Sequence, residues 1–155
     1  MTELAEILKP AAVLPRLRAA DRQQALSALA DAAAKASGLS APEIYESVQE
    51  REKLGGTGVG DGVAIPHARV AGLSAPLGVF ARLENAVDFE AADELPADLV
   101  FLLLSPKEAG ADHLKALATI ARTFRRAEVR DALRAAPSKE AIVVILTPKV
   151  TTDAA

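Results

Sequence analysis

Two histidines, His67 and His113, are the residues of this sequence best suited to chemistry near neutral pH. The histidine side chain changes its charge in this range, and its neutral imidazole is a good nitrogen nucleophile. A histidine taken alone is more often a surface or core residue than a catalytic one. His67 has further support, because it follows a proline that fixes the backbone and comes shortly after a glycine-rich loop. His67 is therefore the candidate nucleophile.

The glycine-rich loop covers residues 55–62 and contains five of the nine glycines of the chain. Backbone N–H groups of such a loop can hold the oxygens of a phosphoryl group, and Gly55, Gly56, Thr57 and Gly58 are the candidates for this role. In the alternative interpretation, the glycines only permit tight turns. The loop lacks the Lys-Ser/Thr of a P-loop and the third glycine of a dinucleotide-binding motif, which disfavours a nucleoside triphosphatase or a dehydrogenase.

Arginine side chains supply the other candidate phosphate ligands. Arg51 comes just before the glycine-rich loop, and the planar fork of its donors matches the geometry of phosphate. The alternative is an ion pair with Glu50 or Glu52. Further along the chain, arginines recur every four residues at positions 122, 126 and 130, which indicates either a solvated helix face or a docking surface for an acidic partner.

The composition of the chain excludes several classes of protein. With 155 residues it has the usual size of one domain, and its formal net charge of −3 gives no general attraction to nucleic acid or to an anionic membrane. The absence of cysteine excludes disulfides and cysteine-ligated metals. Two distant histidines without clustered carboxylates make no credible metal site, so we expect neither a metal nor another cofactor. No apolar run reaches the length of a membrane helix, and we expect a soluble, cytoplasmic protein without membrane insertion.

Hydrophobic patterns and capping residues predict strands that alternate with helices. The expected strands cover residues 13–18, 63–65, 77–83 and 98–104, and the expected helices cover residues 21–37, 40–53, 112–124 and 128–136. Segment 138–146 is ambiguous, because Ser138 is a good helix cap and its run of β-branched residues favours a strand. We predict a single α/β (α+β) domain over residues 1–155, with a mixed sheet of about five strands flanked by helices and a short disordered tail at 148–155.

A longer motif covers residues 51–67, with the sequence Arg-Glu-Lys-Leu-Gly-Gly-Thr-Gly-Val-Gly-Asp-Gly-Val-Ala-Ile-Pro-His. It closely resembles the signature of the fructose/mannitol/nitrogen-type enzyme IIA family of the bacterial phosphoenolpyruvate phosphotransferase system. The similarity extends over nearly the whole chain, includes His113 at the start of a helix, and looks most like the nitrogen-regulatory branch. One departure is Ala68, where many members carry glycine.

The resemblance implies a role for each matching residue. His67 corresponds to the histidine that is phosphorylated on Nε2, His113 to the second active-site histidine that orients the first or its phosphate, and Arg51 to the arginine near the phosphoryl group. It also implies that segment 138–146 includes a short helix.

The implied activity is that of a phosphocarrier. An HPr-like phosphocarrier protein would donate the phosphoryl group, and regulatory targets such as potassium transport components or sensor kinases would respond to the phosphorylation state. Two alternatives stay open: a sugar-specific enzyme IIA that passes the group to an enzyme IIB, and a binding module that is never phosphorylated.

Overall fold

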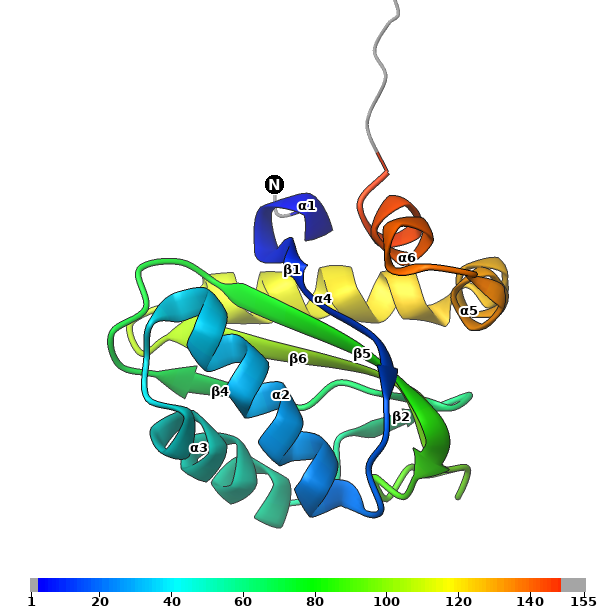
Figure 1. Cartoon of the computed structure of the whole chain (residues 1–155). Helices are drawn as coiled ribbons and strands as arrows, with labels where there is room; N and C mark the ends of the chain where they lie inside the picture. Colours follow the sequence, from blue (N-terminus) through cyan, green and yellow to red (C-terminus); the bar gives the residue numbers. More distant parts are fainter. Residues whose placement is uncertain (1–2, 149–155) are drawn as a thin grey trace, which may run out of the picture.

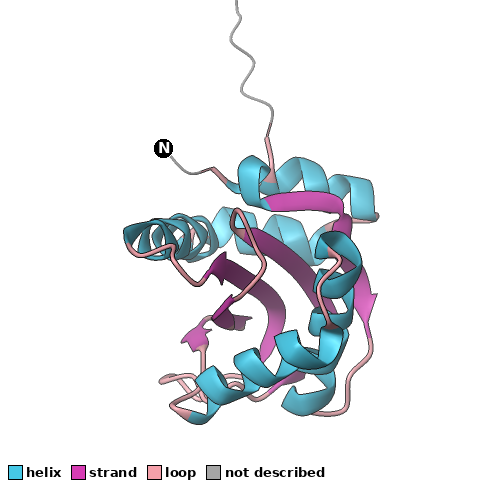
Figure 2. Cartoon of the chain, turned by 90° about the vertical axis from the view of Figure 1, so that its left-hand side faces the viewer, coloured by secondary structure: helices cyan, strands magenta, loops and turns pink. Residues whose placement is uncertain are grey.

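The structure, a computed structural model, describes residues 3–148. They form one mixed β-sheet with helices on both of its faces, as Figure 1 and Figure 2 show. The predicted architecture is therefore confirmed. The strands are β1 (Leu8–Leu17), β2 (Gly58–Gly60), β3 (Val63–Ala64), β4 (His67–Val70), β5 (Leu77–Val87) and β6 (Ala97–Pro106). The helices are α1 (Leu4–Ile7), α2 (Arg22–Ser37), α3 (Ala41–Lys53), α4 (Ala111–Arg125), α5 (Ala127–Ala135) and α6 (Lys139–Leu146).

Strand β6 lies in the middle of the sheet and corresponds to the apolar run that predicts a central strand. It pairs antiparallel with β5 on one side and parallel with both β3 and β4 on the other. The strand order is β1-β5-β6-β3-β2, with β4 on β6, so β1 forms an edge of the sheet. Because β3 and β4 pair with successive stretches of β6, they occupy the same position in the sheet, as one strand that is interrupted at Ile65 and Pro66. This interruption places His67 at the first position of β4.

The sheet has six strands instead of the predicted five or so. Two short strands were not predicted, and each has a physical reason. Strand β2 lies inside the glycine-rich loop, and glycine is a poor strand former. Strand β4 begins directly after Pro66 and has only four residues, although its buried Ala68 and Val70 alternate with the half-buried His67 and the exposed Arg69.

Three helices, α2, α3 and α6, begin at a residue whose side chain caps the helix. The Asp21 side chain accepts a hydrogen bond from the Gln24 amide at the start of α2, and the Ser40 and Ser138 hydroxyls cap α3 and α6 in the same way. Gly38 ends α2 with a φ of 80°, in the left-handed region that favours glycine. Segment 138–146 is a helix, so its cap and the tertiary context outweigh its strand propensity.

The hydrophobic core lies on both faces of β5 and β6. Residues 99–104 of β6 are fully buried, because α2 packs on one face of the sheet and α4 on the other. Phe124 of α4 packs against the rings of Phe80 and Phe101 at centroid distances of 5.9 and 6.0 Å. This packing fixes α4 relative to β6, and both elements carry residues of the site described below.

The ends of the chain bear on two further predictions. The expected disordered tail, 148–155, lies outside the described residues from position 149 onward. Within residues 3–148, no helix is long and apolar enough to cross a membrane.

Candidate functional site

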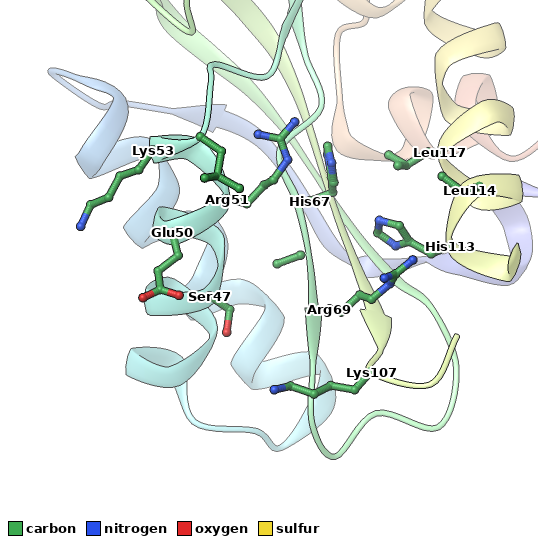
Figure 3. Close-up of a pocket in the computed structure, with 12 residues that line it drawn as sticks. Ser47, Glu50, Arg51, Lys53, His67, Arg69, Lys107, His113, Leu114 and Leu117 are labelled. Carbon is green, nitrogen blue, oxygen red and sulfur yellow. The ribbon is translucent and has the colours of Figure 1, made fainter. Parts of the chain in front are cut away.

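The two histidines and Arg51 line one open pocket of about 750 Å³ between α3, β4 and the start of α4. In Figure 3, Arg51 lies on one side of His67 and His113 on the other. Residues far apart in the sequence are thus brought together as predicted. The rim carries four cations and two exposed leucines: Arg51, Lys53, Arg69, Lys107, Leu54 and Leu114.

The ring of His67 is held in one orientation by the backbone. Its Nδ1 lies 2.8 Å from the carbonyl oxygen of Ile65. A carbonyl oxygen only accepts, so Nδ1 carries the proton and donates it, and in the neutral ring Nε2 keeps a free lone pair. Burial lowers the pKa of His67, the bond to Ile65 opposes this shift, and the Arg51 charge lowers the pKa further. The structure therefore presents a neutral imidazole with a defined nucleophilic nitrogen.

His113 lies in the first turn of α4, and its ring centroid is 5.5 Å from that of His67. The side chain is buried, and its Nδ1 lies 2.7 Å from the Oγ of Ser105. Burial, followed by the nearby His67 and Arg69 charges, lowers the pKa of His113 to about 4. Near neutral pH both rings of the pair are uncharged.

Arg51 lies in the last turn of α3, and its Nη1 donates to the carbonyl oxygen of Gly55 at 2.9 Å. The alternative prediction of an ion pair with Glu50 or Glu52 is wrong for the described residues. Glu52 instead lies within 3.4 Å of Arg22. Within residues 3–148, the guanidinium of Arg51 bonds only this backbone carbonyl, so it is available for an anion in the pocket.

The glycine-rich loop does not form the predicted phosphate cradle. The amides of Gly55 and Thr57 donate to Glu52, and the amide of Gly58 donates to the carbonyl oxygen of Phe89. Moreover, Gly55, Gly56, Thr57 and Gly58 do not line the pocket. A Cβ at Gly56 would clash with the Phe89 carbonyl oxygen, so this glycine permits close packing of two loops. The structural interpretation of these glycines is the better one.

The loop has a supporting role, which depends on Glu52. This carboxylate is buried, and it accepts hydrogen bonds from both the amide and the hydroxyl of Thr57, at 3.0 and 2.8 Å. The carbonyl oxygen of Thr57 in turn accepts from the amide of Ile65 at 3.0 Å. Since the carbonyl of Ile65 orients the His67 ring, Glu52 and Thr57 fix the backbone that sets the orientation of this ring.

Sequence reasoning missed three cations of the pocket, Lys53, Arg69 and Lys107. Arg69 is exposed, lies beside His113 in Figure 3, and donates weakly to the Gly110 carbonyl oxygen at 3.4 Å. It stands two positions after His67 in β4, so it points to the same face of the strand. An alternating pattern over residues 67–70 was the signal that could have identified it.

The arginines spaced along α4 and α5 have mostly local roles. Arg126 pairs with Glu128, and Nη1 of Arg130 donates to the carbonyl oxygens of Phe124 and Arg125 at the end of α4. The exposed Arg126 fits the solvated-face interpretation, whereas the half-buried Arg130 bonds the carbonyl groups at the end of α4. Among residues 3–148, no group of three or more His, Asp or Glu could hold a metal ion.

Comparison with known proteins places this site in a family. Residues 6–149 match the family described as "Phosphoenolpyruvate-dependent sugar phosphotransferase system, EIIA 2". The chain belongs to this EIIA 2 family. The match includes Arg51, His67 and His113, and it confirms the resemblance noted in the sequence.

The relatives of this EIIA 2 chain include proteins named for nitrogen regulation. A "Nitrogen regulatory protein" of Bradyrhizobium diazoefficiens is 47% identical over 143 residues, which cover 92% of this chain and 94% of the relative. The crystal structure of the nitrogen regulatory protein IIA-Ntr from Neisseria meningitidis superposes with a TM-score of 0.87 at 35% identity, over 93% of this chain and 99% of that one. A "PTS system fructose-specific EIIA component" of Haloferax volcanii is 39% identical over 105 residues, or 68% of each chain.

The histidine pair of this EIIA 2 domain gives a testable pH dependence. We expect NMR titration to show a midpoint of about 4 for His113 and a midpoint below the ordinary value of about 6.5 for His67. The unfolded chain protonates its histidines near 6.5, so acid favours unfolding. The contribution of the two histidines to the free energy of unfolding should therefore be fully present above about pH 6.5 and be lost as the pH falls toward 4. A midpoint above 6.5 for either ring in the folded chain would contradict this electrostatic description.

Proposed function

We propose that this EIIA 2 chain is a phosphocarrier that accepts a phosphoryl group on Nε2 of His67 from a phosphohistidine carrier protein of the HPr type. The observation that carries the proposal is the 2.8 Å bond between Nδ1 of His67 and the Ile65 carbonyl oxygen, because it leaves Nε2 as the nucleophile. The ring is half-buried and lines an open pocket, so a partner protein can reach it.

The transfer step exchanges one phosphorus–nitrogen bond for another. The lone pair of Nε2 attacks phosphorus, the bond between phosphorus and the donor imidazole breaks, and its electron pair returns to the donor nitrogen. The Nδ1 proton of His67 stays in place, so the phosphorylated ring carries a positive charge that the Ile65 carbonyl stabilises. The donor ring, protonated in its phosphorylated form, leaves as a neutral imidazole, so no proton has to move.

Catalysis in this proposal consists of alignment and charge stabilisation. A phosphoryl group on His67 would bring two negative charges into the pocket. In the described part of the chain, Arg51 and Arg69 bond only the backbone carbonyl oxygens of Gly55 and Gly110. Exchanging a carbonyl for a phosphoryl oxygen gives each guanidinium a charge-assisted hydrogen bond, which is the stronger kind.

Regulation follows from the same change of charge. The rim of the unphosphorylated pocket carries Lys53 and Lys107 besides the arginines, and the exposed Leu54 and Leu114 lie on its two sides. The phosphoryl group neutralises much of this positive charge, so a target protein would bind the two states differently. The nitrogen-regulatory relatives support a regulatory role, with potassium transport components or sensor kinases as the proposed targets.

A sugar-specific role is the second candidate. It is favoured by the relative named as a fructose-specific EIIA component, which shares 39% identity. In that role the chain would pass its phosphoryl group to an enzyme IIB. A module that is never phosphorylated is disfavoured, because Arg51, His67 and His113 are all present and line one pocket.

Reconstitution of the relay tests the proposal and separates its two forms. A purified, phosphorylated HPr-type carrier should transfer its label to this chain, and affinity capture should then retain different proteins on the labelled and unlabelled forms. Rapid loss of the label to an added enzyme IIB would support the sugar-specific role instead. A chain that takes no label from the carrier would contradict both.

A further inference from the structure

Four polar or charged side chains are buried within residues 3–148: Glu52, Thr57, Ser105 and His113. They form two hydrogen-bonded pairs. The pair of Glu52 and Thr57 supports the backbone before His67, as described above. The pair of Ser105 and His113 does not contact that backbone. Ser105 follows an apolar run of β6 and is itself fully buried. A buried hydroxyl is costly unless it is hydrogen-bonded, so this serine requires an explanation.

The position of Ser105 in the sheet connects it to the site. Its register partner in β4 is Arg69, and the register partner of His67 is Leu103, two residues before Ser105 in β6. Side chains two residues apart in a strand point to the same face. Ser105 therefore lies on the face of the sheet that carries His67 and Arg69. From there its Oγ reaches Nδ1 of His113 at 2.7 Å.

The hydrogen-bond balance decides which atom donates. A serine hydroxyl can either donate to Nδ1 or accept from it. If it accepted, its own proton would need a second acceptor, and within residues 3–148 the contact with His113 is the one hydrogen bond of this hydroxyl. Solvent does not reach the fully buried side chain. Ser105 therefore donates to Nδ1, and the proton of the neutral His113 ring resides on Nε2.

We propose that Ser105 is a positioning residue, which fixes His113 as the Nε2–H tautomer so that this N–H donates to the phosphoryl group on His67. The catalytic part of the proposal rests on the phosphocarrier function proposed above. The two rings then have opposite tautomers. His67 carries its proton on Nδ1 and attacks through Nε2, whereas His113 accepts on Nδ1 and presents Nε2–H. The low pKa of His113 keeps it neutral, so the tautomer matters at every pH above about 4.

Long-range ¹H–¹⁵N NMR of the unphosphorylated chain reads the tautomers directly. In the wild-type chain we expect His113 to carry its proton on Nε2 and His67 on Nδ1. Ser105→Ala should turn His113 into a mixture of tautomers, because nothing then holds Nδ1 as an acceptor. Ser105→Thr keeps the hydroxyl and should keep the tautomer. Ser37→Ala is the matched control, since Ser37 bonds only its own helix and the following turn.

Transfer kinetics give the second readout. Ser105→Ala should slow transfer from the phosphorylated carrier by about tenfold, the factor that one hydrogen bond of ordinary strength controls. The Ser105→Thr and Ser37→Ala variants should stay near the wild-type rate. A wild-type His113 that is protonated on Nδ1 would overturn the inference. A Ser105→Ala chain in which the His113 tautomer or the transfer rate is unchanged would also overturn it. If the carrier labels neither the wild type nor any variant, the proposed function fails. The NMR tautomer of His113 still tests the role of Ser105 in that case.

Discussion

Replacement of His67 by alanine is expected to abolish transfer of a phosphoryl group from a phosphorylated HPr-type carrier. The variant loses the only imidazole that combines an open Nε2 with a backbone-held Nδ1 in the described part of the chain. Without a nucleophile no covalent intermediate forms, so the effect is a loss of labelling and not a slower rate. The measurement is the label retained by the purified chain after incubation with the carrier.

His113→Ala is the matched control for this experiment. It removes the other imidazole of the pocket but leaves the nucleophile and its Ile65 contact in place. This variant should be labelled more slowly than the wild type and still reach full labelling. Label that persists on the His67→Ala chain would move the site to another residue.

Replacement of Arg51 by alanine is expected to reduce the transfer rate by about 10²–10³-fold, as for the loss of one donor to the developing charge in other enzymes. The guanidinium lies beside His67, and its field already lowers the pKa of that ring. Arg51→Lys should recover only part of the rate, because an ammonium keeps the charge without the planar fork. Single-turnover kinetics with excess phosphorylated carrier measure both variants.

Arg125→Ala provides the control for the loss of a positive charge, because Arg125 is exposed at the far end of α4. It should keep the wild-type rate. An Arg51→Ala chain that transfers as fast as this control would show that Arg51 has no part in stabilising the phosphoryl group.

Much of the architecture was predictable because local signals and tertiary packing agree. The apolar run of β6 and the caps at Asp21 and Ser40 each correspond to an observed feature. Strand β4 was missed, since its alternating pattern covers only four residues after a proline and the strand is held by its pairing with β6. Local preferences also conflict in α6, where the short helix implied by the family resemblance is confirmed and packs against β1.

The site was predictable in its principal residues but not in its supporting contacts. His67 and Arg51 were singled out by residue type and by their positions beside the glycine-rich loop, whereas the role of His113 came from the family resemblance. The glycine-rich loop was misassigned, because sequence cannot show that Glu52 and the Phe89 carbonyl already use its amides. The buried Ser105 gives no signal at all in the sequence, since its role exists only through a contact made across the fold.

The most direct measurement is the position of the phosphorus atom in the labelled chain. NMR of the phosphorylated, ¹⁵N-labelled protein distinguishes Nδ1 from Nε2 and assigns the ring. We expect a phosphorus–nitrogen bond at Nε2 of His67, with the Nδ1 proton still donated to the Ile65 carbonyl oxygen. A phosphoryl group on Nδ1 of His67, or on His113, would contradict it.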